Sequence, residues 1–212
     1  MVLLAAFAAG AVPFSGLAAR LTAGVDLRGL GSGTVSGTGL YKVSGFGPLA
    51  IFGSLDVAKG AVGPLLAGTS RPVLSALSAG AGICGHNWSP LLNGAGGRGI
   101  SPALGATLAA APEGAVLLAA GLGGGRLVHQ TGLGCLVALI GMVPLLGRRH
   151  GWRGTLTAAC VAVPIIGKRL AGNAPAPRVG RGRTLVNRLL FDRDPPPAGD
   201  LGGRAQPVAA TA

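Results

Sequence analysis

Charged and aromatic residues are both scarce in this 212-residue chain. Only 11% of the residues are charged, just six of the charged residues are acidic, and 4% of the chain is aromatic. Soluble domains usually carry about 25% charged residues, so this composition argues against a soluble globular protein. The arginines of residues 168–204 have no aromatic platform of the kind on which nucleic-acid-binding proteins stack bases, and we expect no nucleic-acid partner.

Cysteine is nearly absent as well. The three cysteines, Cys84, Cys135 and Cys160, show neither a CxxC pair nor the spacing of metal ligands. Each lies in apolar surroundings, where cysteine behaves as a small buried hydrophobic residue. We therefore expect no disulfide framework and no metal site.

Apolar residues, in contrast, make up 49% of the chain, and the mean hydropathy is +0.57. The 40 glycines and 15 prolines interrupt runs of Leu, Val and Ala. Glycine is well tolerated in membrane helices because small residues let helix backbones approach closely. The apolar content excludes a disordered chain and predicts an all-α integral membrane protein.

Most of the apolar runs are shorter than the about 20 residues that one membrane crossing needs. Residues 1–19 are long enough to cross once, and they lack the positive start of a cleaved signal peptide. The later runs cover residues 43–58, 60–70, 72–84, 100–111, 115–122, 133–146 and 156–166. We therefore expect a polytopic membrane helical bundle of about five to seven short or broken transmembrane helices.

The net charge of +12 is unevenly distributed, and many of the basic residues lie in residues 168–204. The positive-inside rule places this C-terminal part in the cytoplasm and the uncharged N-terminus outside, which requires an odd number of crossings. The basic residues from Arg148 to Arg153 conflict with the rule, because counting every short run as a crossing places them outside. Either two short runs form a re-entrant pair, or this loop is an exception.

A change of composition after Gly172 indicates two regions. Residues 1–174 form the predicted membrane domain, and residues 175–212 form a basic, Pro- and Gly-rich cytoplasmic tail. Such a composition is typical of a mobile segment. Within the tail, residues 185–191 are compatible with one short helix on the membrane surface.

The segment from Ile83 to Gly99 is unusually polar for a stretch between two apolar runs. Its seventeen residues include His86, Asn87, five glycines and Arg98. Membrane-flanked chain tolerates such polarity only where it lines a cavity or a wet surface. Bare backbone N–H groups and a guanidinium together favour an anion such as phosphate. The alternative is a flexible loop that contains a histidine.

Two further polar clusters precede this segment. Residues 26–42 contain a Gly31-Ser32-Gly33 turn, which could present N–H groups and a hydroxyl to a phosphate, between Arg28 and Lys42. A helix beginning near Thr34 would add partial positive charge there. The second cluster is Asp56-Val-Ala-Lys-Gly60, whose Asp and Lys can pair on one helical face. On spacing alone, an ion pair at a helix end on the membrane surface is the favoured interpretation.

Together these motifs resemble one family, the bacterial integral-membrane glycerol-3-phosphate acyltransferases that use acyl-phosphate as the donor. Gly10–Gly16 resembles the opening helix of that family, and Asp26–Gly39 resembles its first motif. Asp56–Gly60 is similar to the second motif, and Gly85–Pro90 with Gly96–Gly99 is similar to the third. The order and spacing agree from about residue 10 to residue 105, whereas further on only the Arg169/Asn173 spacing is similar.

The resemblance implies a multi-pass enzyme of the bacterial inner membrane, surrounded by lipid, with its polar motifs on the cytoplasmic side. Its substrates would be acyl-phosphate and glycerol-3-phosphate, and its product lysophosphatidate, made without coenzyme A or another cofactor. Nothing in the sequence indicates an oligomeric state.

The resemblance and the pattern of glycines and cations together yield the candidate site residues. Ser32, His86 and Asn87 are the candidate catalytic residues. The candidate phosphate-binding residues are glycines, cations and one amide: Arg28, Gly31, Gly33, Lys42, Lys59, Gly60, Gly96, Gly97, Arg98, Gly99 and Asn173.

Five positions depart from the family pattern. Thr34 and Gly39 stand where Asn is usual, Lys42 replaces an Arg, Arg98 replaces a Lys, and Leu170 replaces a His. The change to Lys42 loses a bidentate phosphate fork but keeps the charge. Two other functions therefore stay open: a non-catalytic paralogue, and a small membrane transporter or binding protein for a phosphorylated solute, because broken helices around polar loops also suit transport.

Overall fold

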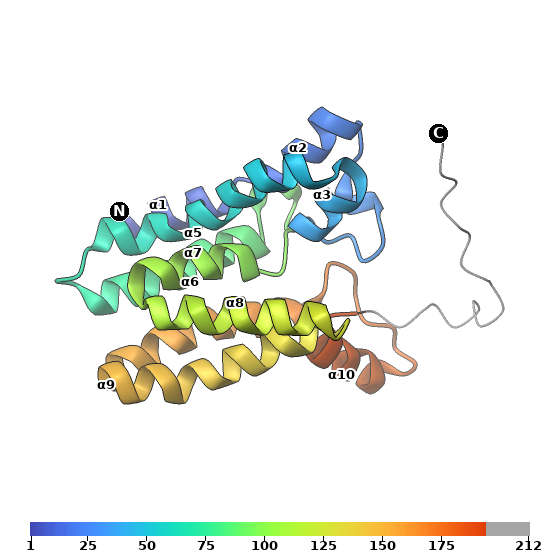
Figure 1. The fold of residues 1–212 in the computed structure, drawn as a ribbon. Coiled ribbons are helices and arrows are strands. Elements are labelled where there is room, and N and C mark those ends of the chain that lie inside the picture. Colours follow the sequence, from blue (N-terminus) through green and yellow to red (C-terminus); the bar gives the residue numbers. More distant parts are fainter. Residues whose placement is uncertain (194–212) are drawn as a thin grey trace.

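The regular secondary structure of residues 1–193, the part that this computed structural model describes, is entirely helical. This confirms the all-α prediction. Three stretches in this part are long and apolar enough to cross a membrane: Val2–Ala23, Phe46–Ala67 and Thr131–Ala171. Shorter apolar helices pack between them (Figure 1).

The first membrane segment is interrupted rather than continuous. Helix α1 covers Val2–Ala11 and α2 covers Phe14–Ala23, with a break at Val12-Pro13. A proline disfavours helical geometry in the residue before it and has no N–H to donate. Val12 accordingly adopts an extended conformation, with φ −67° and ψ 118°. The prediction of a single crossing helix over residues 1–19 therefore missed this interruption.

After α2 the chain forms a small polar cap before it returns to the bundle. The cap contains the 3-10 turn η1 (Leu27–Gly29) and the short helix α3 (Gly37–Ser44). Helix α3 begins where the Ser36 hydroxyl accepts a hydrogen bond from the Gly39 amide, close to the start expected near Thr34. Three helical pieces in direct succession then lead back along the bundle: α4 (Phe46–Pro48), the π-helix η2 (Leu49–Gly53) and α5 (Ser54–Ala67).

The rest of the bundle is antiparallel. Its elements are α6 (Pro72–Asn87), η3 (Pro90–Leu92), α7 (Ile100–Ala110), α8 (Pro112–Leu127) and α9 (Thr131–Ala171). Helix α9 consists of two helical arms, one before and one after Gly151. This residue (φ 61°, ψ −148°) leaves helical geometry, and the chain reverses its direction there (Figure 1). A φ of this sign favours glycine. The two arms contain the predicted runs 133–146 and 156–166.

Seven segments run along the bundle within residues 1–193: α1 with α2, α4 with α5, α6, α7, α8 and the two arms of α9. This is the upper end of the expected range, and the number is odd. The motif loops lie at the end of the bundle that carries α3 and α10, whereas the turn of α9 lies at the opposite end (Figure 1). Arg148–Arg153 therefore lie at the far end, opposite the motif loops, and the side of the membrane that this end faces stays a prediction.

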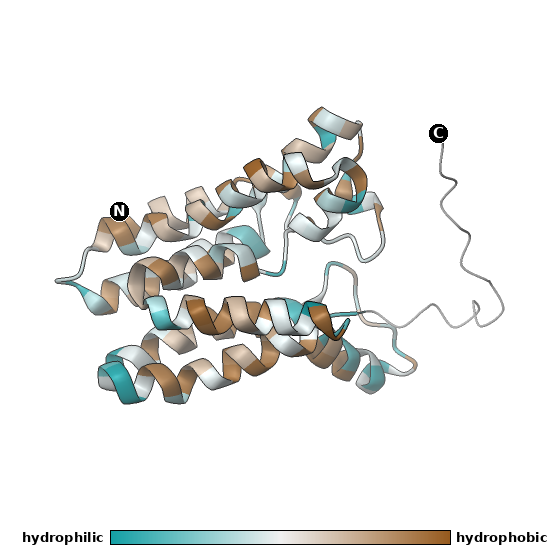
Figure 2. Cartoon of the chain, in the orientation of Figure 1, coloured by the Kyte–Doolittle hydropathy of each residue, from teal (hydrophilic) through white to brown (hydrophobic). Residues whose placement is uncertain are grey.

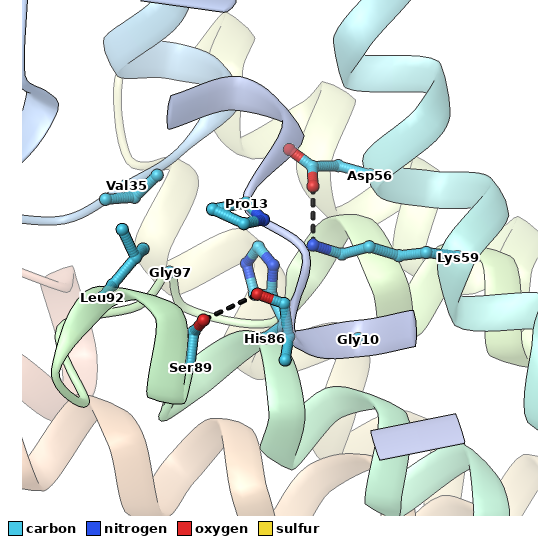
Figure 3. Close-up of a pocket in the computed structure, with 10 residues that line it drawn as sticks. Gly10, Pro13, Val35, Asp56, Lys59, His86, Ser89, Leu92 and Gly97 are labelled. Carbon is cyan, nitrogen blue, oxygen red and sulfur yellow. Dashed lines mark hydrogen bonds and ion pairs between the residues drawn. The ribbon is translucent and has the colours of Figure 1, made fainter. Parts of the chain in front are cut away.

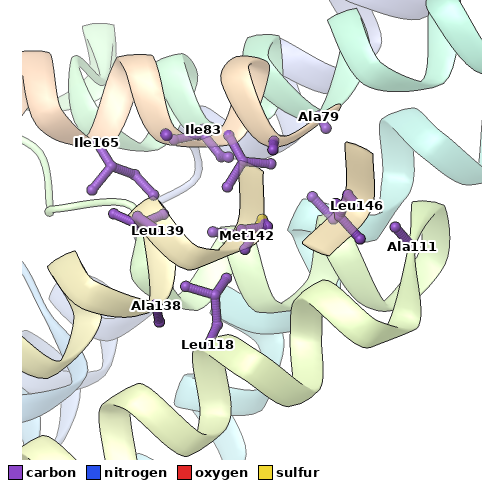
Figure 4. Close-up of a cluster of buried hydrophobic side chains, with 14 residues drawn as sticks. Ala79, Ile83, Ala111, Leu118, Ala138, Leu139, Met142, Leu146 and Ile165 are labelled. Atoms are coloured by element: carbon purple, nitrogen blue, oxygen red, sulfur yellow. The ribbon is translucent and has the colours of Figure 1, made fainter. Parts of the chain in front are cut away.

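The core joins α6, α7, α8 and both arms of α9 (Figure 4). Ile83, Leu118, Leu139, Met142 and Leu146 are fully buried there. Between membrane helices, packing depends on close backbone approach because lipid is as apolar as the side chains. Hydrophobic residues occur along all the long helices of the bundle (Figure 2), and the exposed ones include Leu4, Leu65, Val116, Val137, Ile140 and Val163.

The C-terminal part of the described chain is helix α10, Arg181–Phe191, which packs against α9. It is longer than the expected helix over residues 185–191, and its Arg188 is buried. The boundary proposed after residue 174 stays a prediction, and residues 194–212 lie outside the described part. The three cysteines are free, with Cys135 buried and Cys84 and Cys160 partly buried.

Candidate active site

A buried ion pair lies beside the break in the first membrane segment. Lys59 Nζ lies 2.7 Å from Asp56 Oδ1, and both side chains are 3% exposed. The second carboxylate oxygen of Asp56 accepts hydrogen bonds from the amide and the hydroxyl of Ser15. The pair on α5 is therefore enclosed by the bundle rather than exposed.

Each charge of this pair faces the helix end of opposite sign. Asp56 meets Ser15 in the first turn of α2, where the helix dipole is positive. Lys59 donates to the carbonyl of Val12, just past the negative end of α1. The break exposes backbone groups that lipid cannot satisfy, and Ser89 completes the set by donating to the Ala11 carbonyl, with 2.6 Å between the oxygens. The Asp56-Lys59 pair therefore stabilises an interrupted helix, a role that the sequence analysis did not assign.

Asp56, Lys59 and Ser89 also line a small, tightly packed cavity (Figure 3). His86 comes from the last turn of α6, and Lys59 and Asp56 come from α5. Gly97 of the third motif and Val35 of the first motif close the other sides. The cavity thus joins parts of all three motifs and contains a histidine that is only 8% exposed.

The glycine turn after α6 is held in close contact with His86. A side chain at Gly97 would collide with Nε2 of His86 and with the carbonyl of Val35. The Gly97 amide also donates to the His86 carbonyl over 3.2 Å. The turn ends at Gly99, which has a φ of 81° and precedes the first turn of α7. Only glycine fits this backbone path without strain, which explains the clustered glycines of the third motif.

Two amide side chains hold this turn in place. Asn87 is fully buried and donates to the carbonyl of Pro164 in α9 over 2.8 Å. The side-chain nitrogen of Asn173 donates to the Gly33 carbonyl over 2.8 Å and to the Gly96 carbonyl over 3.1 Å. Asn173 therefore joins the first motif to the third. Its N–H groups are used within the protein, whereas its buried Oδ1 has no partner among residues 1–193.

Arg98 is the cation of the third-motif turn and is only 6% exposed. Its Nη1 donates to the Lys168 carbonyl over 3.1 Å, and its Nε lies 3.0 Å from Oδ1 of Asp192. Lys168 lies 5.4 Å from the Trp88 ring centroid, measured from Nζ, and it donates to the carbonyl of Gly94. The turn is therefore bordered by buried positive charge, as an anion site requires.

The first motif supplies groups nearer the surface. The hydroxyl of Ser32 is exposed and lies 2.9 Å from that of Thr34. Asp26 accepts hydrogen bonds from Arg20 and from Arg28, and the bonds from Arg28 hold the pKa of the Asp26 carboxyl well below its usual range. Lys42 is exposed on α3.

Gly60 has a packing role in this structure. It lies within α5, where a β-carbon would collide with the backbone of Pro102 in α7. The structure thus brings His86, Lys59 and Gly97 to one cavity, and it joins Gly33 to Gly96 through Asn173. Gly31, with a φ of 53°, forms the exposed turn before Ser32. The described contacts do not link Arg28, Ser32 or Lys42 to the cavity.

Comparison with known proteins decides the family. Residues 1–172 match the family described as glycerol-3-phosphate acyltransferase. The chain belongs to this family. It is 31% identical over 207 residues to glycerol-3-phosphate acyltransferase 5 of Dehalococcoides mccartyi (strain ATCC BAA-2266 / KCTC 15142 / 195), a match that covers 90% of this chain and 87% of the relative. It is 30% identical over 198 residues to the glycerol-3-phosphate acyltransferase of Synechococcus sp. (strain CC9902), covering 92% and 93%.

A solved structure of the glycerol-3-phosphate acyltransferase family has the same fold. The crystal structure of PlsY (YgiH), described as an integral membrane glycerol 3-phosphate acyltransferase in its glycerol 3-phosphate form, superposes with a TM-score of 0.73. The identity is 26%, and the match covers 92% of each chain. The resemblance drawn from the three motifs is therefore confirmed, as is the helical membrane fold.

Sequence reasoning missed several residues that shape the site of this acyltransferase family member. Ser15 and Ser89 hold the broken helix, and Asp192 contacts Arg98. The two serines lie inside Gly10–Gly16 and Gly85–Pro90 but were assigned no role, whereas Asp192 is remote from the motifs in sequence. For the two serines, the available signals were their place in these segments and Pro13, which predicts a helix break that needs polar partners. Lys168 had a better signal, because it directly precedes the Arg169/Asn173 segment.

Proposed function

We propose that this chain transfers an acyl group from an acyl-phosphate to the sn-1 hydroxyl of glycerol-3-phosphate, producing lysophosphatidate and inorganic phosphate. The observation that carries the proposal is the glycine turn of Gly96–Gly99, in which Gly97 lines the pocket beside His86 and the neighbouring Arg98 carries a buried guanidinium. Membership of the acyltransferase family supports it. A buried cation in a glycine-rich turn is suited to bind a phosphate group.

The donor is already activated for this reaction. An acyl-phosphate is a mixed anhydride, so the glycerol oxygen attacks the carbonyl carbon, the carbon–oxygen bond to phosphate breaks, and phosphate leaves. The protein has to hold two phosphate-bearing molecules close together against their repulsion. Orienting reactants in this way contributes on the order of 7–11 kcal/mol to lowering the barrier. Backbone N–H groups of the glycine turn are suited to stabilise the developing oxyanion, at about 3 kcal/mol for each donor.

The hydroxyl proton has two potential acceptors, the imidazole of His86 and a phosphate oxygen of a substrate. We favour the substrate phosphate. His86 is 8% exposed and is packed against Gly97 and beside the Asp56-Lys59 pair, so a proton taken up by its ring would place another positive charge near Lys59. A phosphate oxygen accepts the proton without charging the protein interior. In this view, His86 shapes the site and orients the substrate.

The motif end of the bundle is proposed to face the cytoplasm of a bacterial cell, with the protein in the inner membrane. Most of the described arginines and lysines lie at that end, on α2, α3 and α10 and at the end of α9. The opposite end carries Arg71, Arg148, Arg149 and Arg153. The larger share of basic residues stays on the cytoplasmic side of most membrane proteins, and both phosphorylated substrates are soluble or interfacial metabolites of the cytoplasm.

The direct test is acyl transfer by the purified chain in detergent or in lipid vesicles. Acyl-phosphate and labelled glycerol-3-phosphate should yield labelled lysophosphatidate, whereas acyl-coenzyme A should not replace the donor. Absence of product with either donor would reject the enzymatic function. Uptake of labelled glycerol-3-phosphate into vesicles without acylation would instead favour a transporter. If the protein shows neither acyl transfer nor uptake, a non-catalytic paralogue is favoured.

Two variants connect the assay to the proposed site. Arg98→Ala should lower kcat/KM for glycerol-3-phosphate by roughly a hundredfold, since a charge-assisted bond to phosphate contributes about 3 kcal/mol at most. Arg98→Lys is the matched control, because it keeps the charge, and it should retain most activity. Ser32→Ala tests the first motif in the same assay. Activity of Arg98→Ala equal to that of the unchanged chain would place the phosphate site elsewhere.

A further inference from the structure

Within residues 1–193, two of the three guanidinium nitrogens of Arg98, Nε and Nη1, contact acceptors of the protein, and the third, Nη2, has no hydrogen-bond partner. Its Nε faces the carboxylate of Asp192 at 3.0 Å, and its Nη1 donates to the carbonyl of Lys168. Its Nη2 is buried and has no hydrogen-bond partner among residues 1–193. Leaving such a donor unpaired in the interior costs free energy. The arrangement is therefore complete only when another acceptor approaches Nη2.

Asp192 is not a flexible surface residue. It terminates α10 in the left-handed region, with a φ of 53°. Arg169 of α9 fixes this end of α10, because its Nη1 donates to the carbonyl of Leu189 and to that of Gly132. Arg188 fixes the helix further by donating to carbonyls at the end of α9 and just beyond it. The carboxylate is thus held against Arg98 by the docking of a whole helix.

Buried positive charges outnumber negative ones around Arg98 within residues 1–193. Arg98, Lys168 and Arg169 are 6%, 1% and 1% exposed. Of the four carboxylates in the described part, Asp192 alone pairs with this group, because Asp26, Asp56 and Glu113 pair with other residues. In the part of the chain that the structure describes, the charged ends of Lys168 and Arg169 donate to neutral carbonyls, Lys168 also faces the Trp88 ring, and Asp192 attracts Arg169 electrostatically. Within these residues, one carboxylate therefore lies among three buried cations, and this excess of positive charge suits the two negative charges of a phosphate monoester.

We infer that Asp192 is a positioning residue for Arg98, and that α10 serves to hold it there. The carboxylate takes the Nε side of the guanidinium and so turns the free Nη2 toward the phosphate of the substrate. This inference rests on the proposed function of the glycine turn. Asp192 lies beyond residue 172, where the match to the acyltransferase family ends.

The direction in which Asp192→Asn changes KM distinguishes a positioning role from a purely electrostatic or blocking role of Asp192. Asp192→Asn removes a negative charge near a phosphate site, so electrostatics alone would tighten phosphate binding and lower KM. The same result is expected if Asp192 blocks the site by occupying Arg98. A positioning role predicts the opposite. KM for glycerol-3-phosphate should rise at least about tenfold, as expected when a charge-assisted bond is lost, whereas kcat should change less than about threefold.

A double-mutant cycle shows whether Asp192 acts through Arg98. A lysine ammonium at residue 98 needs no orientation of a planar fork, so Asp192→Asn should raise KM less than about threefold in the Arg98→Lys background. A role limited to holding α10 would affect KM equally in both backgrounds. Asp192→Glu keeps the charge and should restore KM toward that of the unchanged chain. Glu113→Gln, the same chemical change at the far end, is the matched control and should leave KM unchanged.

The outcomes separate this inference from the proposed function. No acyl transfer by the unchanged chain rejects the proposed function, and isothermal titration of the same protein with glycerol-3-phosphate then tests Asp192→Asn through the binding constant. An unchanged or lower KM or dissociation constant for Asp192→Asn, with transfer intact, overturns the positioning role alone. Equal effects in the two Arg98 backgrounds also overturn it. If Asp192→Asn does not fold, Asp192→Ser, which also removes the negative charge, is compared in both backgrounds by the same criterion.

Discussion

The two ends of the bundle use the same kinds of charged side chain in opposite ways. At the motif end, the Asp56-Lys59 and Arg98-Asp192 pairs are mostly enclosed, and their hydrogen-bond partners Ser15, Val12 and Lys168 come from distant parts of the chain. At the far end, Glu113 lies between Arg149 and His150, whose side chains are 63% and 45% exposed. Burying charge is costly unless it is well paired, whereas an exposed pair contributes little. The motif end therefore carries charges that the fold retains at a cost in stability, which is typical of a functional site.

The largest effect is expected from exchanging the charges of the enclosed pair. Asp56→Lys with Lys59→Asp keeps an ion pair but places each charge against the wrong end of the broken helix. We expect unfolding to become easier by about 3 kcal/mol or more, because both hydrogen-bond sets to the break are lost. Thermal unfolding in detergent measures this. Asp56→Asn with Lys59→Met, which removes both charges, should be less destabilised. A fully stable exchanged variant would show that the orientation of the pair does not matter.

The second test concerns the close contact in the glycine turn. Gly97→Ala places a methyl group against His86 and Val35, so the turn and the cavity must shift. A displacement of this size near reacting groups costs about a hundredfold in activity, and we expect kcat/KM to fall accordingly. Gly123→Ala in α8, which has open space around it, is the control. Equal activity of the two variants would contradict the cavity as the site of reaction.

A smaller effect is expected at His86. If a substrate phosphate accepts the hydroxyl proton, His86→Ala should keep kcat within about tenfold of the unchanged chain. A general base typically contributes 10²–10⁴-fold. Steady-state turnover with acyl-phosphate measures the difference, and a loss in that higher range would assign the proton transfer to His86.

The smallest effect is expected at the far end. Glu113→Gln weakens the pairs to Arg149 and His150, both of which are largely exposed. Solvent screens such pairs, so the change in the free energy of unfolding should be under about 0.5 kcal/mol. Thermal unfolding in detergent again provides the measurement. A loss as large as that of the exchanged Asp56-Lys59 variant would remove the contrast between the two ends.

The membrane class and the helical fold could be predicted from the sequence, because both follow from composition and run length. Few charges, many apolar residues and glycine-rich runs are local properties that do not depend on which segments meet. The order of the three motifs likewise identified the family, since motif spacing is written along the chain. The break at Val12-Pro13 could also have been predicted, because proline constrains its own backbone and that of its neighbour.

The roles of individual polar residues could not be predicted in the same way. Lys59, Asn87 and Asn173 were expected at the substrate, yet their side-chain N–H groups bond within the protein, across 47, 77 and up to 140 residues. Spacing along the chain indicates which groups are available, whereas only the packed helices decide which of them brace the fold. Asp192 shows the same limit, since its contact with Arg98 exists only because α10 docks on α9. By itself, the sequence determined a helical membrane acyltransferase, and the tertiary structure decided where its buried charges meet.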